Sequence, residues 1–135
     1  MSLIARPLSL NVWVAPQIAL EDLPSLAAQG IRRIVSHRPD GEEPGQPSAA
    51  EMAAAAQAAG MAFIHVPIAG MPGEDAIAAT AGTLQDDAPV LMFCRSGTRS
   101  AMAWAMARRS LGQGEPDDLR AAAASAGYDL SRLPL

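Results

Sequence analysis

The chain has 135 residues, half of them hydrophobic, with a formal net charge of −4 at pH 7 and a single cysteine. This length suits one domain with a buried core, and the acidic balance argues against a general surface for nucleic acid or anionic membranes. Because there is no internal disulfide to form, no apolar run long enough for a membrane span and no signal-like N-terminus, we expect a cytoplasmic protein.

The first predicted elements alternate between strand and helix. β-Forming residues favour a strand over 8–15 (LSLNVWVA), and apolar spacing favours a helix over 19–30 that stops at a glycine. A buried strand is expected over 31–37 (IRRIVSH). The segment 38–48 (RPDGEEPGQPS) is predicted to be a loop, because it contains the turn sequence Pro-Asp-Gly and further prolines and glycines.

The middle of the chain continues this alternation. Ser48 is predicted to cap a helix over 49–60, and Glu51 completes a capping box. A buried strand over 61–68 (MAFIHVPI) comes next and, after a short loop, a helix over 76–86 (AIAATAGTLQD).

The last predicted strand covers 88–94 (APVLMFC) and leads into a helix that begins at Arg99 or Ser100. The apolar run AMAWAMA in this helix predicts burial on most sides, and a final helix is expected over 117–126. Strands that alternate with helices imply an α/β fold with a largely parallel sheet and right-handed crossovers. We therefore predict a single domain, residues 1–135, with a small, mostly parallel sheet of four to five strands flanked by helices.

The only cysteine, Cys94, ends a predicted strand just before a helix begins. Ligands settle at the carboxyl ends of parallel strands, and the free N–H groups of a helix N-terminus bind anions. The same surroundings favour the thiolate, which is the nucleophilic form of cysteine. A small buried structural cysteine is the alternative interpretation. The residues expected to surround the anion are Arg95, Ser96, Gly97, Thr98 and Arg99.

The segment Cys-Arg-Ser-Gly-Thr-Arg-Ser resembles the active-site loop of cysteine-dependent phosphatases and of rhodanese-type sulfurtransferases. The wider pattern SLAAQGIRRIVSHRPDGEE, AAGMAFIHVPIAG and VLMFCRSGTRSAMAWA resembles the bacterial beta-lactamase-hydrolase-like, phosphatase-like domain family. The resemblance implies a protein-tyrosine-phosphatase-like fold in which Cys94 is the nucleophile and Arg99 binds the oxyanion. It also implies that the hydroxyl of Ser100 steadies the sulfur as a leaving group.

Three features depart from the tyrosine phosphatases. Four residues, not five, separate the cysteine from the loop arginine, and Phe93 stands where phosphatases usually carry a histidine. No aspartate follows the strand over 61–68 closely, so Asp75 is the first candidate for a general acid and Asp40 the second. Both have structural interpretations as well: Asp75 suits the start of a helix, and Asp40 lies in a turn sequence.

Two chemistries fit Cys94. Phosphomonoester hydrolysis through a cysteinyl-phosphate is favoured narrowly by the implied fold and by the Arg99-Ser100 pair. Rhodanese-like sulfur transfer through a Cys94 persulfide is the close alternative, because the short loop and the missing acid suit it. A third interpretation is a non-catalytic module that binds phosphate or another anion. The expected partner is a small anionic substrate, or a phosphorylated or thiol-bearing molecule, and neither nucleic acid nor membrane.

The remaining polar candidates are the histidines and their neighbours. His37 and Arg38 end a predicted strand at the same sheet edge as Cys94, so with Asp40 they are candidates to line the pocket. His65 lies in an apolar strand and is expected to be a satisfied residue of the core or rim. One cysteine and two scattered histidines offer no metal-ligand spacing, so we expect neither metal nor cofactor.

Overall fold

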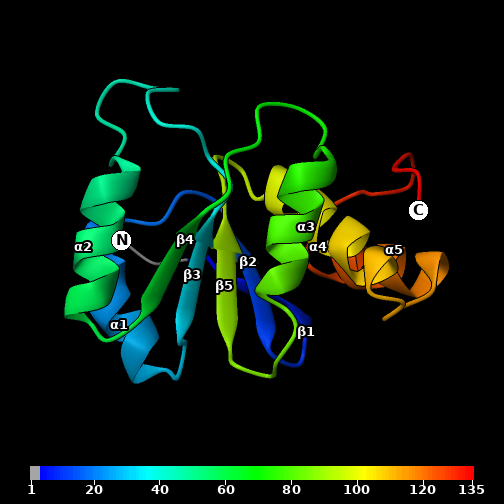
Figure 1. Ribbon diagram of the computed structural model, residues 1–135, viewed down its shortest axis with the longest axis horizontal. Coiled ribbons are helices and arrows are strands. Elements are labelled where there is room, and N and C mark those ends of the chain that lie inside the picture. Colours follow the sequence, from blue (N-terminus) through cyan, green and yellow to red (C-terminus); the bar gives the residue numbers. More distant parts are fainter. Residues whose placement is uncertain (1–3) are drawn as a thin grey trace.

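The computed structural model describes residues 4–135 as a five-stranded sheet with helices on both faces (Figure 1). The strands are β1 (Arg6–Ser9), β2 (Val12–Ala15), β3 (Arg33–Ser36), β4 (Ala62–His65) and β5 (Val90–Phe93). The helices are the 3₁₀ turn η1 (Leu20–Asp22), α1 (Leu23–Ala28), α2 (Ala49–Ala58), α3 (Glu74–Gly82), α4 (Thr98–Ser110) and α5 (Pro116–Ser125). This architecture confirms the predicted α/β class and the mostly parallel sheet.

The order of strands across the sheet is β1-β2-β5-β3-β4. β2, β5, β3 and β4 pair in parallel, whereas β1 is antiparallel to β2. The prediction of one strand over 8–15 is therefore wrong. Leu10 and Asn11 form a turn, with Leu10 89% exposed, and the chain folds back there as a hairpin. A single extended strand would have had to accommodate Asn11, a turn-favouring residue, in its middle.

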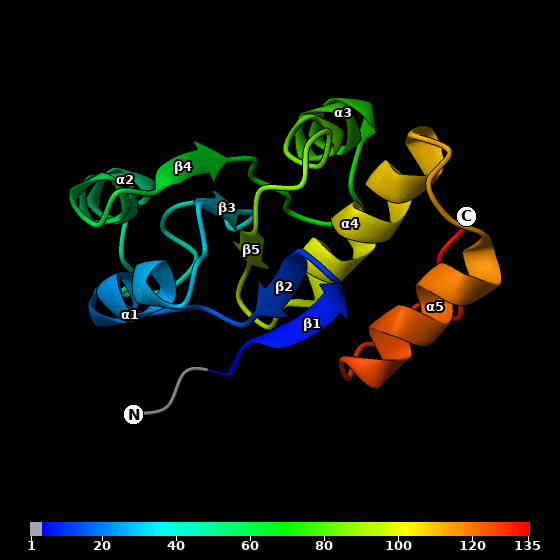
Figure 2. The same cartoon turned by 90° about the horizontal axis from the view of Figure 1, so that it is seen from below.

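Side chains alternate between the two faces of the sheet, as the two-residue period of a strand requires. On one face, Ile34 and Leu91 pack with residues of α1 and α2. On the other face, Val35 and Met92 pack with residues of α4 and α5. Figure 2 shows α1 and α2 on one side of the sheet and α3, α4 and α5 on the other. The central strands are thus covered on both faces.

Helix boundaries differ from the prediction by a few residues. The helix expected over 19–30 is the turn η1 followed by α1, because Pro24 lies in the first turn of α1 and cannot continue a preceding helix. The helix expected over 76–86 begins earlier, at Glu74, and ends at Gly82. The capping box of α2 is confirmed: Ser48 Oγ accepts a hydrogen bond from Glu51 N, and Ser48 N donates to Glu51 Oε1.

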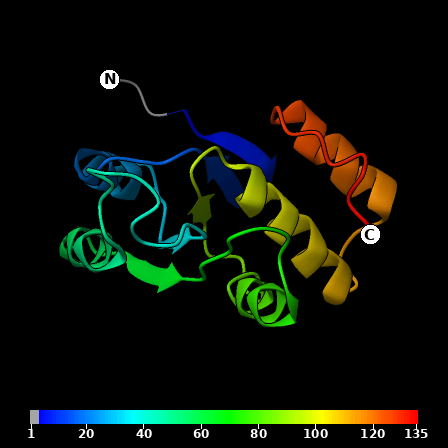
Figure 3. The same ribbon diagram turned by 90° about the horizontal axis from the view of Figure 1, so that it is seen from above.

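Residues 94–97 lie between the end of β5 and the start of α4, and we call the segment 94–99 the thiol loop. Ala101, Trp104 and Ala105 are buried, as the run AMAWAMA predicts. Figure 3 shows α4 lying between α3 and α5. Within residues 4–135, no helix is both long enough and apolar enough to cross a bilayer.

Backbone pairing continues past the strand ends at one edge of the sheet. His37 N donates to Phe93 O at 2.8 Å, and Ile68 N donates to His37 O at 2.9 Å. Gln17 N donates to Arg95 O at 3.2 Å on the other side of β5. These bonds bring the residues that follow four different strands to the same place.

Candidate active site

Cys94 lies at this edge, between the end of β5 and the start of α4. Its side chain is fully buried, and Gly97 N donates a hydrogen bond to Sγ at 3.0 Å. Gly97 is the residue before the helix and has a φ of 98°, a left-handed conformation that favours glycine. The loop therefore curls back on the sulfur and aims an amide at it, as expected.

Tyr128, which follows α5, closes the outer side of this loop. Its hydroxyl donates to Ser96 O at 3.1 Å, and a Cβ placed on Gly97 would lie 2.1 Å from Tyr128 Oη. Burial raises the pKa of Tyr128, and the nearby charge of Cys94 raises it further. The phenol is thus a hydrogen-bond donor at neutral pH, and a side chain on Gly97 has no room.

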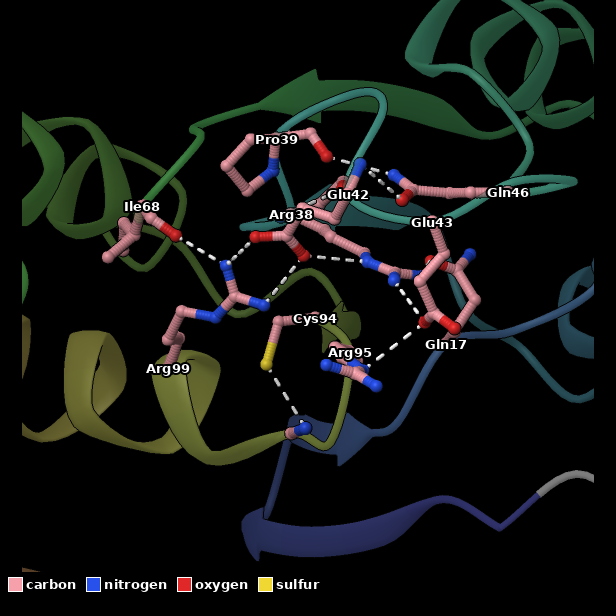
Figure 4. A network of polar contacts seen from close by, with 12 residues as sticks. Gln17, Arg38, Pro39, Glu42, Glu43, Gln46, Ile68, Cys94, Arg95 and Arg99 are labelled. Atoms are coloured by element: carbon pink, nitrogen blue, oxygen red, sulfur yellow. Dashed lines mark hydrogen bonds and ion pairs between the residues drawn. The ribbon is translucent and has the colours of Figure 1, made fainter. Parts of the chain in front are cut away.

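The guanidinium of Arg99 is held from one end. Nη1 donates to Glu42 Oε2 at 2.8 Å and to Ile68 O at 2.6 Å, while Nη2 donates to Glu42 Oε1 at 2.9 Å. Figure 4 shows the guanidinium between Glu42 and the sulfur of Cys94. The hydrogen bond with Glu42 raises the pKa of Arg99, burial opposes this, and the charge of Cys94 adds to it. Of the five N–H donors of an arginine, Nε–H and the second Nη2–H remain along one edge for a ligand.

A second layer of ion pairs surrounds this contact. The buried Arg38 donates from Nε to Glu42 Oε1 at 2.9 Å and also pairs with Glu43, which contacts Arg95 Nε at 3.2 Å. The hydrogen bonds from Arg99 and then Arg38 lower the pKa of Glu42 to about 2. Glu42 is therefore a carboxylate at any physiological pH.

The other expected anion-binding residues differ in exposure. Arg95 is exposed, with 65% of its side chain accessible. Ser96 and Thr98 are exposed as well, and Ser96 Oγ donates to Thr98 Oγ1 at 3.2 Å. The buried part of the loop thus consists of Cys94 and Gly97, with Arg99 partly covered.

His37 lies beneath the loop and not along an open pocket. Its Nδ1 is 2.8 Å from Ser100 Oγ and its Nε2 is 3.0 Å from Thr80 Oγ1, and all three residues are fully buried. Burial, then the charges of Arg99 and His65, lower the pKa of His37 to about 3. The ring is therefore neutral and holds Ser100 at the start of α4.

The two candidate acids lie in local structural roles. Asp40 Oδ1 accepts a hydrogen bond from Ala49 N at 2.8 Å, at the start of α2. Asp75 is exposed in the first turn of α3, and within residues 4–135 it forms no hydrogen bond with the thiol loop. His65 Nε2 is 2.8 Å from Arg38 O, which makes it a satisfied rim residue as expected.

Sequence reasoning missed Glu42, Glu43, Thr80 and Tyr128. The two glutamates could have been found, because they closely follow β3, whose carboxyl end lies beside that of β5. They were overlooked because the Pro-Asp-Gly sequence before them is sufficient to predict a surface loop. No local pattern distinguishes Thr80 or Tyr128, since their contacts depend on how α3 and the segment after α5 pack.

Residues 5–111 match the family model described as "Beta-lactamase hydrolase-like protein, phosphatase-like domain". The chain belongs to this family. A beta-lactamase hydrolase-like protein of Agrobacterium fabrum is 34% identical to the phosphatase-like domain over 122 residues, which cover 89% of the chain. The chain spans only 28% of the length of that relative.

Solved structures agree with this membership. The crystal structure of a candidate phosphatase from Neisseria meningitidis is 31% identical to the phosphatase-like domain, with a TM-score of 0.78 over 94% of this chain and 90% of that one. Kinase-associated phosphatase, solved with its catalytic-site cysteine replaced by serine, is 18% identical, with a TM-score of 0.71 over 92% of this chain and 82% of that one. This second likeness shows the fold alone: the domain has a protein-tyrosine-phosphatase-like fold.

Proposed function

We propose that this phosphatase-like domain is a sulfurtransferase in which Cys94 carries a sulfane sulfur from a sulfur donor to a nucleophilic acceptor. The Cys94 thiolate attacks the terminal sulfur of a donor and forms an Sγ–S bond. The S–S bond of the donor breaks, and the leaving group, sulfite from thiosulfate or a thiolate from a persulfide, takes the electron pair. An acceptor thiolate or cyanide then attacks the outer sulfur of the Cys94 persulfide, and the Cys94 thiolate leaves with its electron pair.

The observation that carries this proposal is that the acidic side chains near the thiol loop are ionised or held in ion pairs. Among residues 4–135, the carboxylates that reach the loop arginines are Glu42 and Glu43, and both are in ion pairs. With a pKa of about 2, Glu42 has no proton to give to a leaving group. His37, with a pKa of about 3, has no imidazolium proton to give either. Sulfur transfer between thiolates needs no general acid, whereas hydrolysis of an ordinary phosphomonoester does.

The loop supplies what a persulfide requires. A hydrogen bond from Gly97 N stabilises negative charge on Sγ, both before attack and when Cys94 leaves. The free edge of Arg99 and the N-terminus of α4 are placed to stabilise charge on the outer sulfur or on an oxyanion of the donor. Because Cys94 is fully buried, a donor must move covering side chains to reach it, which favours a compact reacting group.

Phosphomonoester hydrolysis is the second candidate, because within residues 4–135 neither Asp40 nor Asp75 forms a hydrogen bond with the thiol loop. The specific observation in its favour is the Nε–Nη2 edge of Arg99 beside the N-terminus of α4, which suits two oxygens of a tetrahedral anion. The likeness to a candidate phosphatase from Neisseria meningitidis supports it as well.

Parallel assays separate the two chemistries. The protein is given thiosulfate with cyanide as acceptor, and separately phenyl phosphate, whose poor leaving group makes a general acid necessary. Intact-mass measurement before the acceptor is added distinguishes a persulfide, about +32 Da, from a cysteinyl-phosphate, about +80 Da. Cys94→Ser is the matched control in each assay.

We expect thiocyanate formation and the lighter adduct in the natural chain, and neither in Cys94→Ser. Release of phosphate from phenyl phosphate with no persulfide adduct would overturn the proposal in favour of hydrolysis. Absence of both adducts and both products would leave anion binding alone and would also overturn it.

A further inference from the structure

One peptide unit of the thiol loop is bound at both ends. Its carbonyl belongs to Ser96 and accepts a hydrogen bond from the Tyr128 hydroxyl at 3.1 Å. Its N–H belongs to Gly97 and donates to Cys94 Sγ at 3.0 Å. In a trans peptide the C=O and the N–H lie in the same plane and point in opposite directions. The phenol and the sulfur therefore bind opposite edges of a single peptide unit.

The backbone of Gly97 does not by itself fix the orientation of this peptide. Gly97 has a φ of 98°, and glycine adopts positive and negative φ with nearly equal ease. Rotation of the Ser96–Gly97 plane would point a carbonyl oxygen at the sulfur, where it would repel negative charge. Ser96 belongs to neither β5 nor α4. Gly97 is the N-cap of α4, and its carbonyl accepts a hydrogen bond from Ala101 N at 2.9 Å, which orients the peptide after Gly97 and not the Ser96–Gly97 plane. The Ser96 carbonyl end of the plane is oriented by a contact from outside the loop.

Tyr128 supplies such a contact in two ways. Its hydroxyl holds the carbonyl outward, and its ring fills the space next to Gly97 Cα, where the nearest ring atoms would lie 2.6 and 2.9 Å from an added Cβ. A hydrogen bond to the carbonyl also polarises the peptide and strengthens the N–H as a donor. Tyr128 lies beyond the segment 5–111 that the family model matches.

We propose that Tyr128 is a positioning residue that locks the Ser96–Gly97 peptide, so that Gly97 N–H stabilises the Cys94 thiolate. It acts through the peptide and not by contact with the substrate. The inference rests on the proposed function only in taking Cys94 as the reacting group, and it holds for sulfur or phosphoryl chemistry alike.

Tyr128→Phe tests the lock directly, because it removes the hydroxyl and keeps the ring against Gly97. The first measurement is the pH dependence of Cys94 alkylation by iodoacetamide, which needs neither donor nor acceptor. Without the lock the thiolate loses one net hydrogen bond, so the pH midpoint of alkylation should rise by about half a unit to one unit. A second measurement follows the Gly97 amide by ¹⁵N–¹H NMR, with Cys94→Ser as the reference for an amide that has lost its thiolate acceptor.

We expect the Gly97 amide proton of Tyr128→Phe to move upfield, part of the way towards its position in Cys94→Ser. Tyr128→Ala, which also removes the ring, should move both readouts further. An unchanged alkylation midpoint together with an unchanged Gly97 resonance in Tyr128→Phe would overturn the inference, even if sulfur transfer is observed. Shifted readouts in a protein that transfers no sulfur would uphold the lock while the proposed function fails, so the two outcomes are distinguishable.

Discussion

Glu42 binds the guanidinium of Arg99 end-on, with Nη1 and Nη2 donating to its two carboxylate oxygens at 2.8 and 2.9 Å. This contact occupies the Nη1–Nη2 end of the guanidinium, and the edge formed by Nε and Nη2 remains available on the side of the thiol loop. Bidentate pairs of this kind fix direction as well as distance. Arg99 is therefore oriented before any ligand arrives, by a residue from the loop after β3.

Glu42→Gln tests this orientation. The amide keeps the size of the side chain but has one acceptor oxygen and no charge, so one hydrogen bond to Arg99 is lost. We expect kcat for transfer to fall about tenfold, since misplacing one transition-state donor costs at least this much. Glu43→Gln is the matched control, because in the described part of the chain Glu43 pairs with Arg38 and Arg95. Equal losses in steady-state assays of the two variants would contradict this assignment.

Arg99→Lys should be far more damaging than Arg95→Lys. An ammonium group cannot hold Glu42 and Ile68 O while also presenting two parallel donors to a ligand. We expect kcat/KM to fall about a hundredfold for Arg99→Lys. For Arg95, whose side chain is 65% exposed, we expect little change. A comparable loss of kcat/KM in both variants, measured with the same donor, would show that the loop requires positive charge and not the two parallel N–H donors of Arg99.

Gly97→Ala should destabilise the domain more than Gly41→Ala does. Both glycines have positive φ, 98° and 76°, so each variant carries the strain of a left-handed alanine, about 1 kcal/mol. Of these two glycines, only Gly97 would place the added Cβ against a side chain, 2.1 Å from Tyr128 Oη; at Gly41, no atom of residues 4–135 beyond its chain neighbours lies within 4 Å. We expect a loss of about 3 kcal/mol in the free energy of unfolding for Gly97→Ala, measured with urea. Equal losses would mean that Tyr128 moves aside without cost.

Stability should fall as the pH is lowered from 6.5 to 5.5. The pKa of His37 is lowered to about 3 in the folded chain, against an ordinary value of 6.5. Between these values the unfolded chain binds a proton that the folded chain does not, so the free energy of unfolding decreases with falling pH. The limiting slope for one such proton is about 1.4 kcal/mol per pH unit. The measurement is the midpoint of urea unfolding at several pH values in this interval.

His37→Asn is the control for this pH dependence. Asparagine keeps a polar group beside Ser100 but does not titrate, so the slope should flatten. Glu42 does not disturb the comparison, because its pKa of about 2 keeps it ionised in the folded chain throughout. The same slope in both proteins would assign the pH dependence to another group.

The fold could be predicted from the sequence because strand and helix patterns alternate from β2 to α4. The segment 8–15 was the exception: its β-forming residues suit one strand or two, and only pairing with β5 decides that the chain turns at Leu10 and Asn11. The sharp bend at Gly97 was predictable as well, because a glycine between a strand and a helix can adopt the positive φ that such a bend requires.

The partners of Arg99 could not be predicted in the same way. Glu42 follows a Pro-Asp-Gly turn that accounts for the loop by itself, and its contact with Arg99 spans 57 positions of the chain. Asp75 was expected near the thiol, but α3 begins at Glu74, and within the described residues the helix start gives Asp75 a local role. Long-range polar contacts depend on side-chain placement that no periodicity encodes.

The ion pairs around the loop have a consequence for how substrates arrive. Three arginines (Arg38, Arg95 and Arg99) face two glutamates (Glu42 and Glu43) and, once ionised, one sulfur, so the opposing charges cancel. A cluster without excess charge exerts little pull beyond a Debye length, about 8 Å at physiological ionic strength. The cluster itself therefore adds little to the diffusional capture of an anionic donor, and its discrimination among donors arises only after collision.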